Sequence, residues 1–218
     1  MKEYQRIHCQ SWPVDSDRSA STKRIRSQQL YQHILDTIAQ QSGYDRSNLS
    51  IMKSTHGKPQ VMYYHDRKNT PMDDTFISVS HCRFFSVWTC QPQPCAIDIE
   101  PIDAHRSIHR LLPRLLERID WAHRATHECT SADFESEIAL LSNDDRAMLF
   151  YRLWTFCESW CKWHGQTLWQ TLAERIPFPW PSLTHCLREQ VTTLSRSMQI
   201  HYDFDTASGC LICLLSTP

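Results

Sequence analysis

The sequence has few glycines: only four among 218 residues, at positions 43, 57, 165 and 209. Average usage near 7% would give roughly 15. A P-loop and a dinucleotide-binding G-x-G-x-x-G turn both need clustered glycines, and these four lie far apart. The sequence therefore excludes both motifs, and any phosphate group bound by this chain must be held by side chains or by an isolated turn.

The sequence also lacks a long apolar run and an excess of one charge. No stretch approaches the roughly 18 apolar residues of a membrane span, and Met1–Gln5 is not followed by the apolar segment of a signal peptide. The net charge is −1 at pH 7. A basic segment over 18–28 is short and has no interleaved aromatics. We expect a cytoplasmic protein with no membrane or nucleic-acid partner.

Ten cysteines are present, at scattered spacings. A chain of this length buries roughly 70% of its surface on folding and needs no disulfides, so we expect reduced thiols. Cys157, Cys161 and His164 have a spacing that permits zinc binding. Because no Cys-x-x-Cys turn accompanies them, ordinary buried thiols are the favoured interpretation.

The N-terminal half is predicted to contain one long helix, because Ile25, Leu30, Ile34 and Ile38 recur at helical spacing and Gly43 follows them. Short apolar runs that are β-branched or aromatic, and are bounded by Pro, Asp or Gln, indicate strands. These predicted strands cover 4–9, 61–64, 76–80, 84–89 and 95–99.

The C-terminal half is predicted to contain the strongest helix, over 143–164. Ser142 or Asn143 caps it, and Gly165 ends it. A helical stretch over 105–119 is expected to be interrupted at Pro113, and 198–216 is expected to form two strands around 205–209. With a boundary near 92–95, the pattern predicts an α+β fold in two halves, 1–93 and 94–218.

Two carboxylates stand on one face of the predicted strand Ala96-Ile97-Asp98-Ile99-Glu100, because alternate residues of a strand share a face. Such neighbours repel each other unless they are solvated or bridged by a cation. Mg²⁺ is a suitable cation, since it binds one or two carboxylates together with substrate phosphates. The alternative is a strand with a solvated acidic face.

Glu158 and Lys162 share a face of the strong helix at spacing i, i+4. An exposed ion pair is one interpretation, and it would contribute little to stability. Their neighbours, however, are unusually apolar for a solvated acid: Trp154, Phe156, Cys157, Trp160 and Cys161.

Two segments of the N-terminal half present candidate phosphate contacts. His56-Gly57-Lys58-Pro59 is a turn that presents one lysine, and the strand 76–81 ends in Ser80 and His81. Each segment alone fits an ordinary surface equally well.

The order and spacing of these segments resemble the surfactin-type 4′-phosphopantetheinyl transferases. Arg26 precedes Gly-Lys-Pro, Ser-His, Ile-Asp-Ile-Glu and then Trp-x-x-x-Glu-Ser-x-x-Lys, a resemblance covering about residues 20–168. The specific part is Ile-Asp-Ile-Glu followed by Phe150-Tyr-x-Leu-Trp, Glu158-Ser and Lys162. The tail 210–213 also resembles the last strand of that family.

The resemblance implies a monomer of two pseudosymmetric halves, each a helix packed on a small, mainly antiparallel sheet. It implies an enzyme that transfers the 4′-phosphopantetheine arm of coenzyme A to a serine of an acyl, peptidyl or aryl carrier protein and releases 3′,5′-ADP. Asp98, Glu100 and Glu158 would hold Mg²⁺ or Mn²⁺. Glu158 would also be the base for the carrier serine, and Lys162 would steady the diphosphate or the leaving phosphate.

The resemblance also implies that Arg26, Lys58, Ser80 and His81 contact the phosphates of coenzyme A, with Lys23 as a further candidate. It implies that residues 101–142 recognise the carrier protein. Arginines of that segment are candidates for the contact: Arg106, Arg110, Arg114, Arg118 and Arg124.

Three positions depart from the family pattern. Cys157 stands where a lysine is usual, Ala96 replaces a glycine, and Cys82 replaces a common serine. The loss of a cation at 157 motivates an alternative function, in which a degenerate member binds coenzyme A or a carrier protein without efficient transfer. Because Lys162 and all three acids are present, an active enzyme is the favoured interpretation.

Overall fold

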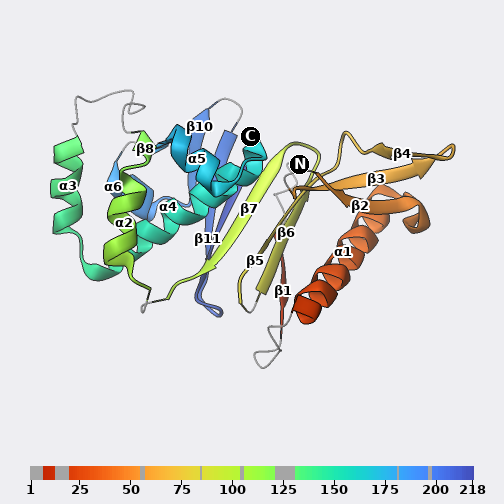
Figure 1. Cartoon of the computed structure of the whole chain (residues 1–218), viewed down its shortest axis with the longest axis horizontal. Helices are drawn as coiled ribbons and strands as arrows, with labels where there is room; N and C mark the ends of the chain where they lie inside the picture. The colour runs from red at the N-terminus through yellow and green to blue at the C-terminus, as the bar shows by residue number, and fades with distance from the viewer. Residues whose placement is uncertain are drawn as a thin grey trace. The chain divides into compact units, whose positions relative to one another are not determined.

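The computed structural model describes residues 7–12, 20–54, 57–83, 85–103, 106–120, 131–180, 182–195 and 198–218, without the side chains of 20, 21, 23, 131–134 and 169. The chain forms two compact units, Met1–Cys95 and Ala96–Pro218. Unit 1 is coloured red to yellow in Figure 1, and unit 2 continues through green to blue. Both units combine helices with small, mainly antiparallel sheets, which confirms the predicted α+β class.

Unit 1 packs the helix α1 (Ala20–Ser42) against two three-stranded antiparallel sheets. The first sheet has the order β1 (Ile7–Ser11), β6 (Phe85–Gln91), β5 (Phe76–His81). The second has the order β2 (Leu49–Lys53), β3 (Pro59–His65), β4 (Lys68–Pro71), and the short 3-10 helix η1 (Arg46–Asn48) precedes it.

The predicted apolar face of α1 is confirmed from Leu30 onward. Leu30, Ile34 and Ile38 are buried and pack in one core with Trp88 of β6. Ile25 is 52% exposed, so its assignment to the core face is wrong. Because the core begins one turn later, the first part of α1 is left for polar contacts.

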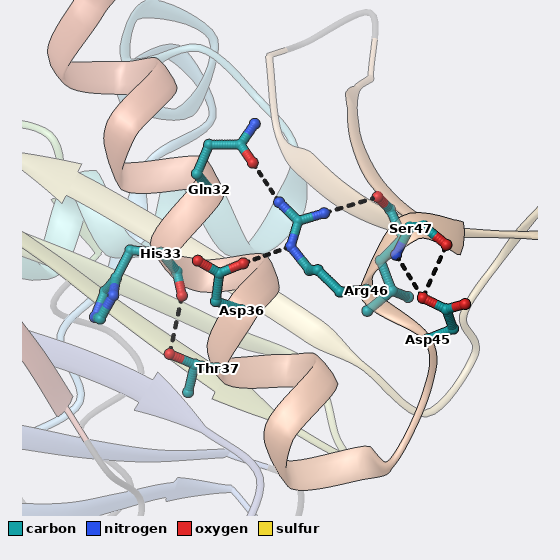
Figure 2. Close-up of polar contacts among 8 residues, drawn as sticks. Gln32, His33, Asp36, Thr37, Asp45, Arg46 and Ser47 are labelled. Carbon is teal, nitrogen blue, oxygen red and sulfur yellow. Dashed lines mark hydrogen bonds and ion pairs between the residues drawn. The ribbon is translucent and has the colours of Figure 1, made fainter.

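Arg46 fixes the exit of the chain from α1, as Figure 2 shows. Its guanidinium donates to Asp36 Oδ1 over 2.6 Å and to the side-chain oxygen of Gln32. Asp45 caps η1 by accepting bonds from the N–H and the hydroxyl of Ser47. These contacts set the direction in which β2 begins.

Unit 2 is built on the long helix α4 (Asn143–His164), which runs across a four-stranded sheet (Figure 1). The strand order is β10 (Val191–Ser195), β11 (Met198–Asp205), β12 (Cys210–Ser216), β7 (Cys95–Pro101). Shorter elements complete the unit: α2 (Ile108–Leu116), β8 (Ile119–Asp120), α3 (Ser131–Leu140), α5 (Leu168–Glu174), β9 (Ile176–Pro177) and α6 (Leu183–Arg188).

The prediction for α4 is confirmed at both ends. The Ser142 hydroxyl accepts the N–H of Asp145 over 3.1 Å, and Gly165 ends the helix in the left-handed conformation at φ 67°. The expected interruption at Pro113 is wrong, because Pro113 lies inside α2. A proline removes one donor, to the carbonyl four residues earlier, and a helix of nine residues loses only that one bond.

The described cysteines form no disulfides, as predicted, and Cys129 lies outside the described residues. Most of them are buried. Within the described ranges, no helix is long and apolar enough to cross a membrane.

Candidate active site

Strand β7 holds the first two candidate acids. Asp98 is only 5% exposed, and Glu100 is half-buried at the end of the strand. The interpretation of a solvated acidic face is therefore wrong for Asp98. A buried carboxylate requires a compensating partner, because burial without one costs several kcal/mol.

Helix α4 supplies that partner. Lys162 donates to Asp98 Oδ1 over 2.8 Å and to the carbonyl of Ile97 over 2.9 Å. Eight residues earlier on the same face, Trp154 Nε1 donates to Glu100 Oε1 over 3.0 Å. Glu158 lies midway between these two contacts along the helix. Residues four apart on α4 lie on one face of the helix, and this face contacts Asp98 and Glu100, the alternate residues on one face of β7.

Arg106 is a member of this cluster that the sequence did not identify. Its Nη1 lies 3.3 Å from Glu100 Oε2, and its guanidinium lies 4.9 Å from the ring centre of Trp154 and 5.1 Å from that of Phe150. The sequence suggested only a carrier contact for Arg106. The aromatic spacing on α4 is the one signal that favours a cation here, since guanidinium groups pack on aromatic faces.

Burial and the neighbouring carboxylates raise the pKa of two acids of the cluster, Glu158 and Glu100. Burial raises the pKa of Glu158, and the charges of Asp98 and Glu100 raise it further, while Lys162 and Arg106 act in the opposite direction. Burial and Asp98 also raise the pKa of Glu100, against the attraction of Arg106. Three carboxylates thus share two cations.

A divalent cation fits the chemistry of this donor set, because carboxylate oxygens are the ligands that Mg²⁺ prefers and the cluster has one more acid than cation. The cations of the chain, however, already hold Asp98 and Glu100. Among the described residues, no three His, Cys, Asp or Glu side chains form a group that could hold a metal ion. A metal would therefore have to draw these carboxylates away from Lys162 and Arg106.

In unit 1, two of the predicted phosphate contacts lie at one end of the first sheet. Arg26 of α1 packs over the ring of Trp12, 5.3 Å from its centre. Trp12 Nε1 donates to Ser86 Oγ over 2.8 Å, and Ser86 Oγ lies 2.7 Å from His81 Nδ1. Arg26 Nη2 is buried with no hydrogen-bond partner in the described part of the chain. Trp12 and Ser86 thereby connect Arg26 with His81.

The other predicted contacts of unit 1 do not join this group. Ser80 is buried and, as a neighbour in an extended strand, points to the opposite face from the exposed His81. Burial lowers the pKa of Lys58, which interacts with Cys95. Cys95 contacts Phe76 at the start of β5, and the five residues from there to His81 span about 16 Å.

Two of the remaining candidates fall partly outside the described residues. Lys23 lies in α1, but its side chain is not among those described, and Arg124 lies outside the described residues. Cys157 is fully buried in the core of unit 2, together with Leu153 and Phe156. The position that usually bears a lysine therefore does not face the acids in this chain.

Neither a protein-family model nor a curated protein matches the chain.

Proposed function

We propose that the chain is a 4′-phosphopantetheinyl transferase that modifies a serine of a carrier protein with the phosphopantetheine arm of coenzyme A. The observation that supports this best is the matched pairing of α4 with β7, in which Lys162 meets Asp98 and Trp154 meets Glu100. The resemblance places the same acids and lysine at the reacting diphosphate. The pseudosymmetric two-half fold of that family belongs to the same proposal.

Asp98, Glu100 and Glu158 would hold Mg²⁺, which would neutralise the diphosphate while its β-phosphate is attacked. Glu158 is the residue suited to accept the serine proton, because its raised pKa brings it closer to the operating pH. The serine oxygen forms a bond to the β-phosphorus, the bond to 3′,5′-ADP breaks, and the proton moves to a carboxylate oxygen of Glu158.

Lys162 has two tasks in this proposal. Without substrate it compensates the buried charge of Asp98. With Asp98 as a ligand of the bound cation, the ammonium group of Lys162 would be available to the leaving phosphate. A lysine suits this exchange because its ammonium is a compact charge on a flexible stem.

The basic residues of unit 1 fit a ligand with two separate anionic groups. Arg26 and His81 lie at one end of the sheet, and Lys58 lies near the other. Coenzyme A has a diphosphate and a distant 3′-phosphate, so separate contacts are expected for a ligand of this kind.

A labelling assay tests the proposal. The protein is incubated with a fluorescent coenzyme A analogue, Mg²⁺ and a panel of apo carrier proteins, including those of fatty acid, polyketide and nonribosomal peptide synthesis. We expect at least one carrier to be labelled, and we expect Glu158→Gln to abolish labelling. Glu137→Gln, which changes an exposed carboxylate on α3, is the matched control. Absence of labelling across the panel would refute transferase activity.

A second candidate is a binding protein that holds coenzyme A or a carrier without transfer. The observation that favours it is that Lys162 and Arg106 already pair with two of the three acids. Measurement of 3′,5′-ADP release separates the two functions. Tight binding of coenzyme A with no release of 3′,5′-ADP in the presence of the apo carrier panel would favour the binding protein.

A further inference from the structure

His81 and Ser86 are directly opposite each other in the β5–β6 hairpin. Ser86 in turn pairs with Gln10 of β1, and Trp12 follows two residues later. Cross-strand partners share a face of the sheet, so these side chains gather on the same face near the end of β5. None of the sequence motifs includes Trp12 or Ser86.

Among the described residues, the hydroxyl proton of Ser86 has one hydrogen-bond acceptor. Ser86 is 1% exposed, and its hydroxyl has two described neighbours, the Trp12 indole and His81 Nδ1. An indole N–H only donates, so it occupies a lone pair of Ser86 Oγ and leaves the serine proton for Nδ1. The alternative, in which Nδ1 carries a proton, would leave a buried hydroxyl proton without an acceptor, at a cost of about 1–3 kcal/mol.

We infer that Ser86, held by Trp12, is a positioning residue that fixes His81 as a neutral imidazole with its proton on Nε2. The bonding order runs from the Trp12 N–H to Ser86 Oγ and from the Ser86 hydroxyl to His81 Nδ1. His81 is thereby oriented as a single N–H donor.

This assignment gives the residues of the group different tasks. His81 contributes an oriented hydrogen bond, and Arg26, which packs over the ring of Trp12, contributes the positive charge. Trp12 thus supports both groups, since its N–H holds Ser86 while its ring face carries the guanidinium. The contact of His81 with a phosphate of coenzyme A rests on the proposed function, whereas the proton position does not.

Nitrogen-15 NMR of the full chain, labelled at histidine, tests the inference. Long-range proton–nitrogen spectra are recorded at pH 8.5, where imidazoles are neutral, and the His81 signals are those lost in His81→Gln. We expect Nδ1 of the wild type to have the shift of an unprotonated nitrogen. Ser86→Ala should move it toward the tautomer mixture of a free imidazole, and Ser86→Thr should retain the wild-type shift.

Ser78→Ala is the matched control, because it removes another buried hydroxyl from the sheet at a β5 position that faces away from His81. It should leave the His81 nitrogens unchanged. A protonated Nδ1 in the wild type, or unchanged His81 shifts in Ser86→Ala, would overturn the positioning role.

Kinetics separate this inference from the proposed function. If His81 contacts coenzyme A, Ser86→Ala should raise KM for coenzyme A about fivefold while kcat stays within about twofold. A changed tautomer with unchanged KM would support the role of Ser86 and refute the contact with coenzyme A. Absence of transfer by the wild type would refute the enzyme and leave the NMR result intact.

Discussion

Cys157 stands where the transferases that the sequence resembles usually have a lysine. Its side chain is fully buried, and burial raises the pKa of its thiol well above the ordinary range. A lysine introduced there would have to enter the core rather than the cluster of acids. The apolar surroundings of position 157 therefore suit a cysteine, and they provide no place for a cation beside the acids.

We predict that Cys157→Lys lowers the free energy of unfolding by several kcal/mol and gives no gain in transfer, because an unpaired ammonium would be buried. Urea unfolding followed by tryptophan fluorescence measures the change. Cys9→Lys, at an exposed position of β1, should unfold like the wild type. A stable Cys157→Lys variant with faster transfer would show that the side chain reaches the site.

Glu158 makes stability depend on pH. Its pKa is raised in the folded state, so the folded protein retains a proton that the unfolded chain releases. Stability contributed by this group is therefore present at low pH and is lost as pH rises through the folded-state value.

We predict that Glu158→Gln becomes more stable than the wild type as pH rises from about 4.5 to 8, because glutamine resembles the protonated acid. The free energies of unfolding in EDTA should converge at the acidic end. Glu137→Gln should show no such pH-dependent gain. A constant difference between Glu158→Gln and the wild type would contradict the raised pKa.

Individual residues differ in how far sequence could predict them. Asp98, Glu158 and Lys162 were predicted from strand and helix periodicity, and the structure joins Lys162 to Asp98. Arg106 and Ser86 were not, because their partners depend on a loop path and on hairpin register. The aromatic spacing on α4 favours a cation but does not indicate which residue supplies it, and no local spacing indicates Ser86.

Helix α4 sets the distances of the acid cluster. Trp154, Glu158 and Lys162 recur at intervals of one turn, and the last of them lies three residues before Gly165. The end of the helix therefore influences how Lys162 reaches Asp98. Gly165 has room for a Cβ atom but has a positive φ, so its requirement is conformational.

We predict that Gly165→Ala costs about 1 kcal/mol of stability and that Gly165→Asn costs less, because asparagine tolerates the left-handed conformation. Urea unfolding measures both variants. Equal losses in the two would show that the glycine is required for a reason other than φ.

The elements that the sequence predicted best are long, or have clear capping or turn residues at their ends. Helix α4 has a serine cap and a terminal glycine, and the β11–β12 hairpin turns at 205–209 where Gly209 donates to the Asp205 carbonyl. The short elements β2, β4, α5 and α6 were missed, because a few residues show too little periodicity. Pro113 was misjudged because tertiary packing of Leu112 and Leu115 holds α2 together.

At the scale of the whole molecule, the proposed metal site would couple cation binding to folding. A cation that binds the folded chain alone stabilises it by mass action. At a Mg²⁺ concentration about ten times the Kd, the gain is about 1.4 kcal/mol.

We predict that Mg²⁺ raises Tm by a few degrees relative to EDTA and that Asp98→Asn removes this shift. Differential scanning fluorimetry with matched ionic strength measures it. Asp203→Asn, at an exposed carboxylate of β11, should retain the shift. Equal shifts in all three proteins would indicate a general salt effect and contradict the proposed metal ligands.

The cysteine thiols give each unit its own chemical reporter. In unit 2 the described thiols are all buried, and burial raises the pKa of Cys213 to about 12, so an alkylating reagent finds almost no thiolate there while the unit is closed. Unit 1 has the exposed Cys9, which reacts without any opening. Timed alkylation followed by peptide mass spectrometry can therefore measure how often unit 2 opens, without an introduced label.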